Sequence, residues 1–318
     1  MQQGISTHIF LPRRLSPGLL DTLVAAGAST IEVFAARHHF DYTDAGVVRE
    51  IANWFRSSNG ITATMHMPLY PDTAWSRHTA PTLDLISASK AARIEAQDEV
   101  KRALEAAEQV PFTTCVIHLG MKDDKWDNRS LDDSLTAIEH LKAFAGPLGI
   151  KLLLENLSNE VATPANLVEI VRIGHFSNVG FCLDTGHANL AEAIPETSDG
   201  PAKSGIEQAF EAFGDNLVEL HLHDNHGSRD EHLWPGDADI DWKLVAAKVA
   251  ALKTQPVGVL EIAYELGEET GKVVEKAKAA WDVLAVASVE RAAATDGSAN
   301  VSQLELRGLR TRRGAVVR

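Results

Sequence analysis

The feature that most constrains the fold of this chain is a strand-like segment followed by a helix-like segment, repeated eight times. The strand-like segments are short apolar runs, and the helix-like segments place apolar residues at helical spacing. Eight such units favour a parallel sheet closed into a (β/α)8 barrel. An open doubly wound sheet is the alternative, but no glycine-rich phosphate loop follows the first strand. We expect strands at residues 4–10, 30–35, 61–67, 113–119, 151–156, 179–185, 218–223 and 257–262, and helices at residues 18–26, 45–56, 83–108, 131–145, 165–173, 204–213, 242–252 and 268–284.

Length and composition fit one soluble domain. The chain has 318 residues, of which 45% are hydrophobic and 23% charged, and α/β barrels of this size do not split. We expect a single barrel domain over residues 1–289. Residues 290–318 lose apolar periodicity and become arginine-rich, which predicts a flexible basic C-terminal tail. A basic arm that contacts phosphate or a partner subunit is the alternative.

The sequence is typical of a cytoplasmic protein. Cys115 and Cys182 both stand in apolar runs, which fits buried thiols in a reducing compartment and no disulfide framework. We find no signal peptide at the N-terminus, and no window approaches the roughly 18 apolar residues of a membrane span. The net charge of −14 disfavours binding to nucleic acid or to an anionic membrane.

The densest group of reactive side chains lies in residues 219–242. An alternating strand pattern ends in His221-Leu222-His223-Asp224, and Asp230-x-His232 follows in the next loop. A polar loop with solvated histidines is the alternative interpretation of this segment alone. We prefer a binding site, because the same arrangement recurs elsewhere in the chain.

Six consecutive predicted strands end in residues of the metal-ligand type. Because barrels place their functional residues at the carboxyl ends of the strands, these side chains should meet at one face. Imidazole and carboxylate ligands suit Zn²⁺, Mn²⁺ or Fe²⁺, and the lack of thiolates argues against a structural zinc cluster. We therefore expect either two or three ions, or one ion with several substrate-binding side chains. The candidate ligands are His66, His118, Glu155, Asp184, His187, His221, Asp230, His232 and Glu261.

Two kinds of chemistry fit these residues. Glu155 and Glu261 end well-separated strands, so both can approach a substrate that lies across the centre of the barrel. A carboxylate on either side of a metal-polarised carbon can remove a proton from one face and return one to the other. A cluster of ions would instead activate water and hold a phosphoryl oxygen.

Four motifs resemble those of the xylose-isomerase-like barrel superfamily, which comprises sugar isomerases and epimerases together with endonuclease IV. The resemblance covers the chain from about Gly4 to about Ser288. It implies a TIM barrel, and its members are often dimers or tetramers, so a homo-oligomer is compatible with it. The motifs are Glu155-Asn156, Leu183-Asp184-Thr185-Gly186-His187, His221-Leu222-His223-Asp224 and Asp230-x-His232…Pro235-Gly236-x-x-x-Ile240-Asp241.

The resemblance to the isomerase and epimerase branch implies one divalent ion, Zn, Mn, Mg or Co. Its ligands would be Glu155, Asp184, His221 and Glu261, and the two glutamates would also serve as acid and base. His187 would contact the sugar.

The chain departs from the ketose 3-epimerases of that branch at two positions. Val161 stands where they carry a Glu and Gly227 where they carry an Arg, and Arg229 is out of register. These departures argue against a free-ketose 3-epimerase.

The resemblance to the endonuclease branch implies three zinc ions held by all nine candidate ligands. Two parts of its signature are absent. Its first-strand motif is replaced by Ser6-Thr7-His8-Ile9-Phe10, and Gly186-His187 stands where that branch has Cys-His.

Further side chains are expected to contact the substrate. Trp75, Trp126 and Trp234 stand in loops on the functional face, where an indole can stack on a sugar ring. His223 and Arg229 are also candidates for substrate binding. Local loop packing is the alternative for the tryptophans, and surface solvation is the alternative for Arg229.

Taken together, the sequence predicts a divalent-metal-dependent isomerase or epimerase of a small sugar or sugar phosphate. It would transfer a proton at a metal-bound hydroxy-ketone, with Glu155 and Glu261 as the acid/base pair. The alternative is a multi-zinc phosphodiester hydrolase of the apurinic-site endonuclease type, which the acidic net charge disfavours because duplex binding needs a cationic surface. A barrel kept only for sugar or partner binding is a third interpretation.

Overall fold

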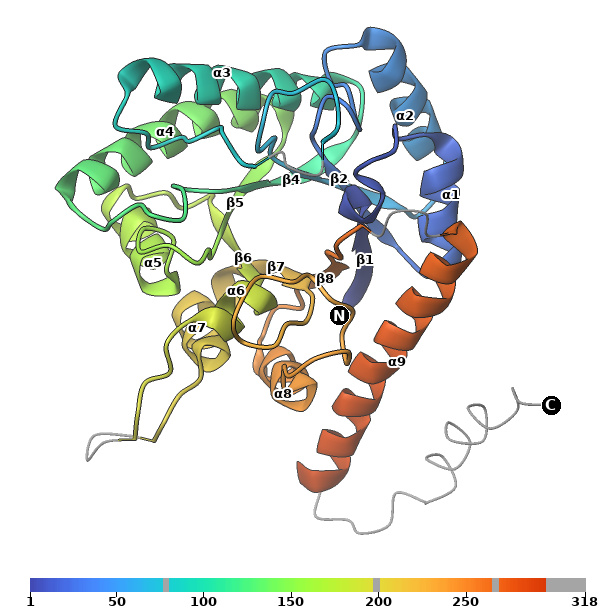
Figure 1. Cartoon of the computed structure of the whole chain (residues 1–318), viewed down its shortest axis with the longest axis vertical. Coiled ribbons are helices and arrows are strands. Elements are labelled where there is room, and N and C mark those ends of the chain that lie inside the picture. The colour runs from blue at the N-terminus through green and yellow to red at the C-terminus, as the bar shows by residue number, and fades with distance from the viewer. Residues whose placement is uncertain (77–79, 197–200, 265–268, 296–318) are drawn as a thin grey trace.

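The computed structural model describes residues 1–76, 80–196, 201–264 and 269–295, without the side chains of residues 286–295. Eight parallel strands form a closed barrel in the order β1 to β8, with helices around it (Figure 1). The predicted (β/α)8 TIM barrel is therefore confirmed. The strands are β1 Gln2–Ser6, β2 Thr30–Phe34, β3 Thr62–His66, β4 Phe112–Ile117, β5 Lys151–Glu155, β6 Gly180–Asp184, β7 Leu217–Leu222 and β8 Val257–Leu260.

The helices lie outside the strands, and the last one packs against the first, which closes the outer ring. Side-chain caps begin several of them; Asp44, for example, accepts hydrogen bonds from the backbone of the first turn of α2. The α-helices are α1 Pro17–Ala25, α2 Ala45–Ser57, α3 Lys90–Glu105, α4 Asn128–Ala145, α5 Pro164–Ile173, α6 Thr185–Leu190, α7 Gly205–Phe213, α8 Trp242–Ala251 and α9 Thr270–Thr295, and the 3-10 helices are η1 Thr7–Phe10, η2 Ala106–Glu108, η3 Gly146–Leu148 and η4 Gly214–Asn216.

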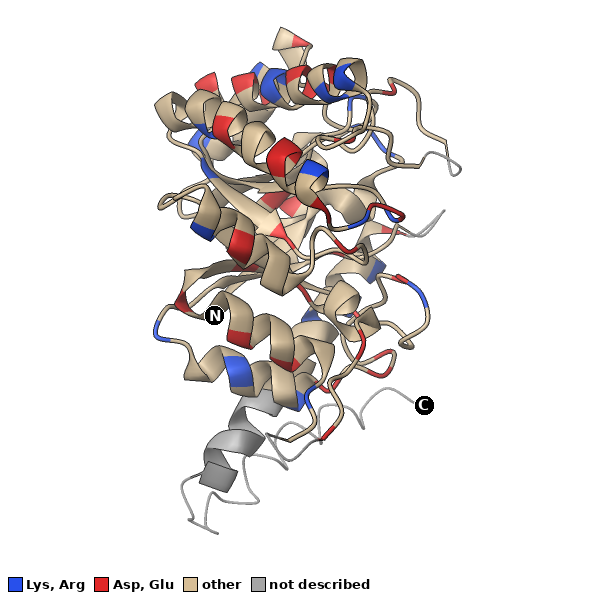
Figure 2. Ribbon diagram, turned by 90° about the vertical axis from the view of Figure 1, so that its left-hand side faces the viewer, with Lys and Arg blue, Asp and Glu red and all other residues tan. Residues whose placement is uncertain are grey.

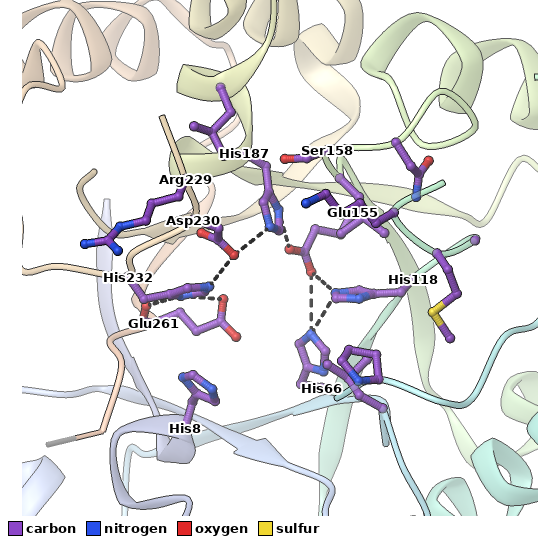
Figure 3. A pocket seen from close by; sticks show the side chains of 18 of the residues that line it. His8, His66, His118, Glu155, Ser158, His187, Arg229, Asp230, His232 and Glu261 are labelled. Carbon is purple, nitrogen blue, oxygen red and sulfur yellow. Dashed lines mark hydrogen bonds and ion pairs between the residues drawn. The ribbon is translucent and has the colours of Figure 1, made fainter. Parts of the chain in front are cut away.

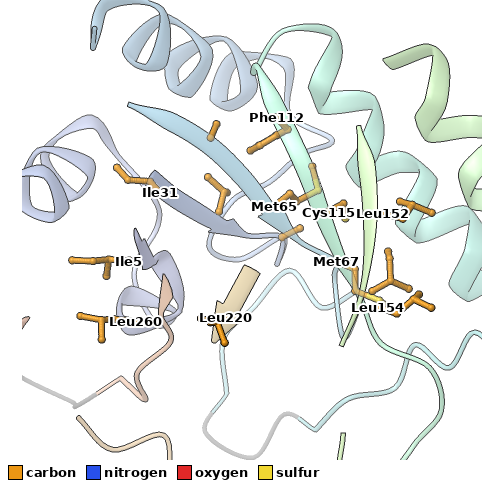
Figure 4. Close-up of a cluster of buried hydrophobic side chains, with 14 of the residues drawn as sticks. Ile5, Ile31, Met65, Met67, Phe112, Cys115, Leu152, Leu154, Leu220 and Leu260 are labelled. Carbon is orange, nitrogen blue, oxygen red and sulfur yellow. The ribbon is translucent and has the colours of Figure 1, made fainter. Parts of the chain in front are cut away.

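The two faces of the barrel strands differ in chemistry. Successive residues of a strand point to opposite faces, and one set forms the apolar layer between sheet and helices, including Ile5, Met65 and Leu220 (Figure 4). The alternate set faces the interior, because Thr114 of β4 reaches Glu219 of β7 across the barrel. Barrel interiors are usually filled by branched apolar side chains. Here the apolar cluster of Val116, Leu153 and Cys182 shares the interior with the buried acids Glu32 and Glu219.

The first predicted strand is wrong in its second half. The strand was expected to run through Phe10, but β1 ends at Ser6 and η1 follows. The hydroxyl of Ser6 accepts a hydrogen bond from His8 N at 3.2 Å, and this local cap ends the extended backbone. The side chain of His8 consequently turns into the mouth of the barrel.

Three helices also differ from the predictions. The helix expected from residue 83 begins only at Lys90, where Ser89 caps it, so the preceding residues form a loop. The short helix α6 was not predicted; Asp184 ends β6 and caps α6 by accepting from His187 N at 2.6 Å. The last helix continues to Thr295, past the start of the predicted tail, and residues 296–318 of that tail lie outside the described residues.

The outer surface carries acidic and basic residues interspersed along the helices (Figure 2). Cys115 and Cys182 are free and buried. Within the described ranges, the helices are all too short or too polar to cross a membrane.

The long β7–α8 loop is organised by one buried carboxylate. Asp224 is fully buried and accepts hydrogen bonds from Gly236 N at 2.9 Å, Ile240 N at 3.0 Å and the indole Nε1 of Trp242 at 2.9 Å. Ala238 N and Asn225 N add two further bonds at 3.2 Å and 3.0 Å. The Pro235-Gly236…Asp241 part of the motif is therefore a loop folded around Asp224.

This arrangement predicts a large stability loss for Asp224→Ala, because it leaves the buried donors Asn225 N, Ile240 N and Trp242 Nε1 without their acceptor. We expect the free energy of unfolding to fall by about 3–5 kcal/mol, measured by urea denaturation. Asp237→Ala is the matched control, since Asp237 is exposed in the same loop, and it should change stability by less than about 0.5 kcal/mol. Equal effects of the two substitutions would contradict this role for Asp224.

Candidate metal centre

The strand ends that carry His, Asp and Glu surround one cavity of about 570 Å³ at the carboxyl face of the barrel, a size suited to a small-molecule ligand. Asp184 and His221 do not line the cavity and are fully buried next to it. The other predicted ligands do line it, as Figure 3 shows: His66, His118, Glu155, His187, Asp230, His232 and Glu261.

A central group brings together Glu155, Asp184, His221 and Glu261, with one ligand atom of each within 4.8 Å of the others. The Nδ1 atom of His221 lies 3.1 Å from Glu261 Oε2, 3.4 Å from Glu155 Oε2 and 4.0 Å from Asp184 Oδ2. The same nitrogen is buried and makes no hydrogen bond with any described residue, so even the shortest of these contacts lacks hydrogen-bond geometry. Three carboxylates thus converge on an unpaired imidazole nitrogen.

A second group consists of His66, His118 and Glu155. The Nε2 atoms of the two imidazoles are 3.0 Å apart, and Glu155 Oε2 lies 2.9 Å from His118 Nε2 and 3.5 Å from His66 Nε2 (Figure 3). Both rings point their outer nitrogen at the same carboxylate oxygen.

A third group consists of His187, Asp230 and His232. Asp230 Oδ2 lies 3.2 Å from His187 Nε2 and 3.0 Å from His232 Nε2. His232 has a positive φ of 48°, which is uncommon for a residue other than glycine and marks a constrained position. The loop built around Asp224 therefore holds this histidine at the cavity.

Backbone carbonyls orient three of these histidines. The Nδ1 of His66 lies 2.8 Å from Met67 O, that of His187 lies 3.0 Å from Asn156 O, and that of His232 lies 2.9 Å from Glu261 O. A carbonyl oxygen only accepts, so each Nδ1 donates its proton to the backbone and each Nε2 is directed at the cavity.

The buried charges stabilise one another. Burial alone would raise the pKa of Glu155, but His118 and His221 hold it well below its usual range. Burial likewise opposes the charge on His232, but the neighbouring Asp230 raises the pKa of His232 to about 10. Such mutual stabilisation is what a set of buried carboxylates and imidazoles needs when no lysine or arginine lies among them.

The residues fit a divalent metal. An imidazole coordinates through a lone pair, and carboxylates supply the negative charge that a divalent ion neutralises. The unpaired Nδ1 of His221, surrounded by carboxylate oxygens, is the donor arrangement for such an ion. Glu155 belongs to both the central and the second group, so it would be a ligand whichever group holds the ion.

His223 does not line the cavity, although it was expected to contact the substrate. Its side chain is fully buried, with Nε2 at 2.8 Å from Asp184 Oδ2. Its ring stacks on His232 with a centroid distance of 3.8 Å. A Cβ at Gly186 would lie 1.9 Å from the ring, which explains why the Asp-Thr-Gly-His motif has glycine at this position. His223 therefore orients two predicted ligands.

The three loop tryptophans are also absent from the cavity lining. Trp234 is buried in the hydrophobic core, and Trp126 packs against that core. Trp75 meets Tyr264 edge to face, with ring centroids 5.4 Å apart. Local packing, the alternative interpretation, describes their positions. Arg229 does line the cavity, but its side chain is 78% exposed and its guanidinium pairs with Glu231 at 3.0 Å.

The sequence analysis missed His8, which lines the cavity. Its Nδ1 lies 3.0 Å from Ile262 O, and burial lowers the pKa of His8 to about 4, so the ring is neutral at pH 7. A histidine near the end of the first strand was the available signal, and the strand predicted through Phe10 concealed it.

Comparisons with known proteins agree with this fold. The chain is 29% identical over 258 residues to the uncharacterized protein MJ1311 of Methanocaldococcus jannaschii, which covers 78% of this chain and 79% of the relative. The solved structure of D-psicose 3-epimerase in the presence of D-fructose superposes with a TM-score of 0.68 at 20% identity, covering 91% of this chain and 99% of that one. The IOLI protein with a bound zinc atom superposes with a TM-score of 0.68 at 17% identity, covering 90% and 99%.

These two structural likenesses establish the fold, since their sequence identities are low. The sequence profile described as "Xylose isomerase-like TIM barrel" matches residues 20–282, which include all nine predicted ligands. The chain therefore belongs to the xylose isomerase-like TIM-barrel family.

Proposed function

We propose that this protein is a divalent-metal-dependent isomerase or epimerase of a sugar or sugar phosphate. The observation that carries the proposal is the central group, in which Glu155 Oε2 and Glu261 Oε2 lie 3.4 Å and 3.1 Å from the unpaired Nδ1 of His221. The resemblance of the fold to D-psicose 3-epimerase supports a sugar as the substrate.

The two glutamates would act as the acid/base pair. Glu155 ends β5 and Glu261 follows β8, so they enter the cavity from strands that are not neighbours. One carboxylate removes a proton from a substrate carbon, and the other returns a proton to the same or the adjacent carbon. The pKa of Glu261 is held well below its usual range by His221 and His232, although burial alone would raise it, so Glu261 is ionised and can serve as the base.

Asp184 and His221, together with the two glutamates, would hold the ion. When bound, a divalent ion supplies Lewis acidity that makes a carbon next to a carbonyl group easier to deprotonate. The neutral ring of His8 and the exposed edge of His187 would position hydroxyl groups.

The cavity suits a small substrate better than a nucleic acid. Among the residues that line it, Lys122 and Arg229 are the basic ones, and Arg229 is already paired with Glu231. Duplex binding needs several cationic contacts to phosphate, and the net charge of the chain is −14. One or two cationic groups would suffice for a sugar phosphate.

Glu261→Gln should abolish proton transfer, because the amide cannot accept the proton. Wild-type protein loaded with Mn²⁺ is incubated in deuterated water with a panel of ketoses, aldoses and their phosphates. We expect wild type to incorporate deuterium into at least one sugar, and Glu261→Gln to do so about 10²–10⁴ times more slowly, as measured by NMR. Metal content is determined in parallel, since Glu261 is also a predicted ligand.

Glu160→Gln is the matched control for this experiment, since Glu160 is exposed in the loop that follows Glu155 and pairs with Lys125. It should exchange at the wild-type rate. Absence of exchange by the metal-loaded wild type with every sugar, or an unchanged rate in Glu261→Gln, would refute the proposal.

The second and third groups support a second candidate function, a multi-zinc phosphodiester hydrolase. The specific observation is that each group presents three ligand atoms within 4.8 Å of one another, with the Nε2 atoms of His66 and His118 only 3.0 Å apart. Neighbouring ions could activate water and hold the phosphoryl oxygen.

His118→Asn separates the two candidates, because His118 belongs to the second group and not to the central one. For a hydrolase, we expect the variant to lose one zinc ion per chain and its activity on bis(4-nitrophenyl) phosphate and an abasic-site duplex. For an isomerase with one ion, the variant should still bind one ion per chain and still exchange sugar, at a rate reduced by the loss of the contact between His118 and Glu155. His140→Asn, an exposed histidine on α4, is the control and should match wild type in both assays.

A further inference from the structure

Glu32 lies at the centre of the polar barrel interior and was not among the predicted site residues. It stands in the middle of β2, within the sequence Thr-Ile-Glu-Val-Phe, and is fully buried. Its Oε2 atom lies 3.1 Å from Nε2 of His221, which comes from β7 across the barrel and is also fully buried. In the described part of the chain, Glu32 forms an ion pair with this imidazole.

The contact fixes which nitrogen of His221 carries the proton. An ionised carboxylate only accepts hydrogen bonds, so Nε2 must donate. Nδ1 is then the nitrogen directed at the carboxylates of Glu155 and Glu261, and it is the one that can coordinate an ion. The other end of the same ring therefore faces the proposed metal centre.

His221 differs in this respect from the other histidines of the cavity. His66, His187 and His232 each give their inner N–H to a neutral backbone carbonyl. His221 alone among these four gives its inner N–H to a carboxylate, that of Glu32. It also differs in directing Nδ1, and not Nε2, at the carboxylates of the central group. Burying a carboxylate without a lysine or arginine beside it costs free energy of folding. The presence of Glu32 in the interior therefore indicates a specific role.

We propose that Glu32 is a positioning residue, which orients the ring of His221 and keeps its Nδ1 lone pair available to a divalent ion. The inference rests on the metal centre of the proposed function, and deepens it by naming the residue that controls the histidine ligand. A carboxylate acceptor also makes the imidazole a stronger donor to a metal, and loss of such a partner typically weakens metal binding by about 10–100-fold.

Glu219 provides a matched control in the same interior. It is buried on β7, and its Oε1 lies 4.0 Å from the same Nε2 of His221, beyond hydrogen-bond distance. Its other oxygen accepts a hydrogen bond from the hydroxyl of Thr114 at 3.3 Å. Glu219 therefore has the same chemistry and burial as Glu32, but it does not bond the ring.

The test compares Glu32→Met, Glu32→Gln and Glu219→Met with wild type. Methionine keeps the volume but removes the acceptor, whereas the glutamine amide retains a carbonyl that can accept from Nε2. Zinc affinity is measured by competition with a chromogenic chelator. We expect about 10–100-fold weaker binding for Glu32→Met, a smaller loss for Glu32→Gln, and wild-type affinity for Glu219→Met.

The second readout is the tautomer of His221, which does not depend on activity. Spectra of ¹⁵N-histidine-labelled, metal-free protein are assigned with a His221→Asn variant. We expect wild type and Glu219→Met to show an Nε2–H of His221 that is hydrogen-bonded to a carboxylate, and Glu32→Met to lose this signal. Thermal melting verifies that each variant folds. If Glu32→Met does not fold, the zinc affinity of Glu32→Gln provides the test.

The outcomes separate this inference from the proposed function. Unchanged zinc affinity and an unchanged Nε2–H signal of His221 in Glu32→Met would overturn the positioning role, even if the wild type epimerises a sugar. If Glu32→Met does not fold, unchanged zinc affinity in Glu32→Gln would overturn it. Conversely, the zinc affinity and the His221 signal could depend on Glu32 in a protein that exchanges no sugar. That result would support the positioning role and contradict the proposed function. A wild type that binds no zinc would overturn both.

Discussion

Several carboxylates and imidazoles share one buried space at the mouth of this barrel, and their mutual compensation is the constraint on which the rest of the structure depends. Glu155, Asp184 and Glu261 would each be strongly destabilised in a buried site without a nearby positive charge. His221 and the cavity histidines provide that charge in part, and a divalent ion would provide it fully. The buried carboxylates and imidazoles are therefore stable only together, because each group compensates the charge of its neighbours.

The barrel supplies hydrogen-bond acceptors for the N–H groups of the ligand histidines. Strand ends leave backbone carbonyls at the carboxyl face, and these take the Nδ1–H of His66, His187 and His232. The ring of His221 lies deeper in the barrel, and there the side chain of Glu32 accepts the N–H in place of a backbone carbonyl. The interior acids Glu32 and Glu219 are thus continuous with the site chemistry, and they lie in the same interior as the apolar cluster of Val116, Leu153 and Cys182.

Much of this could be predicted from the sequence, because strand ends are marked by an abrupt change from apolar to polar residues. The convergence of His66, Glu155 and Glu261 follows from barrel geometry alone. The positions of Trp234 and His223 could not be predicted, since loop packing depends on contacts such as that between Gly186 and the His223 ring. Glu32 was missed because a single acid inside an apolar strand has no local partner in sequence.

The central claim is that Glu155, Asp184, His221 and Glu261 hold a divalent ion. Anomalous diffraction at the zinc absorption edge, from crystals grown with one equivalent of zinc, tests it most directly. We predict an anomalous peak within coordination distance of His221 Nδ1 and of the carboxylates in this group. The absence of a peak there, or peaks confined to other parts of the molecule, would contradict it.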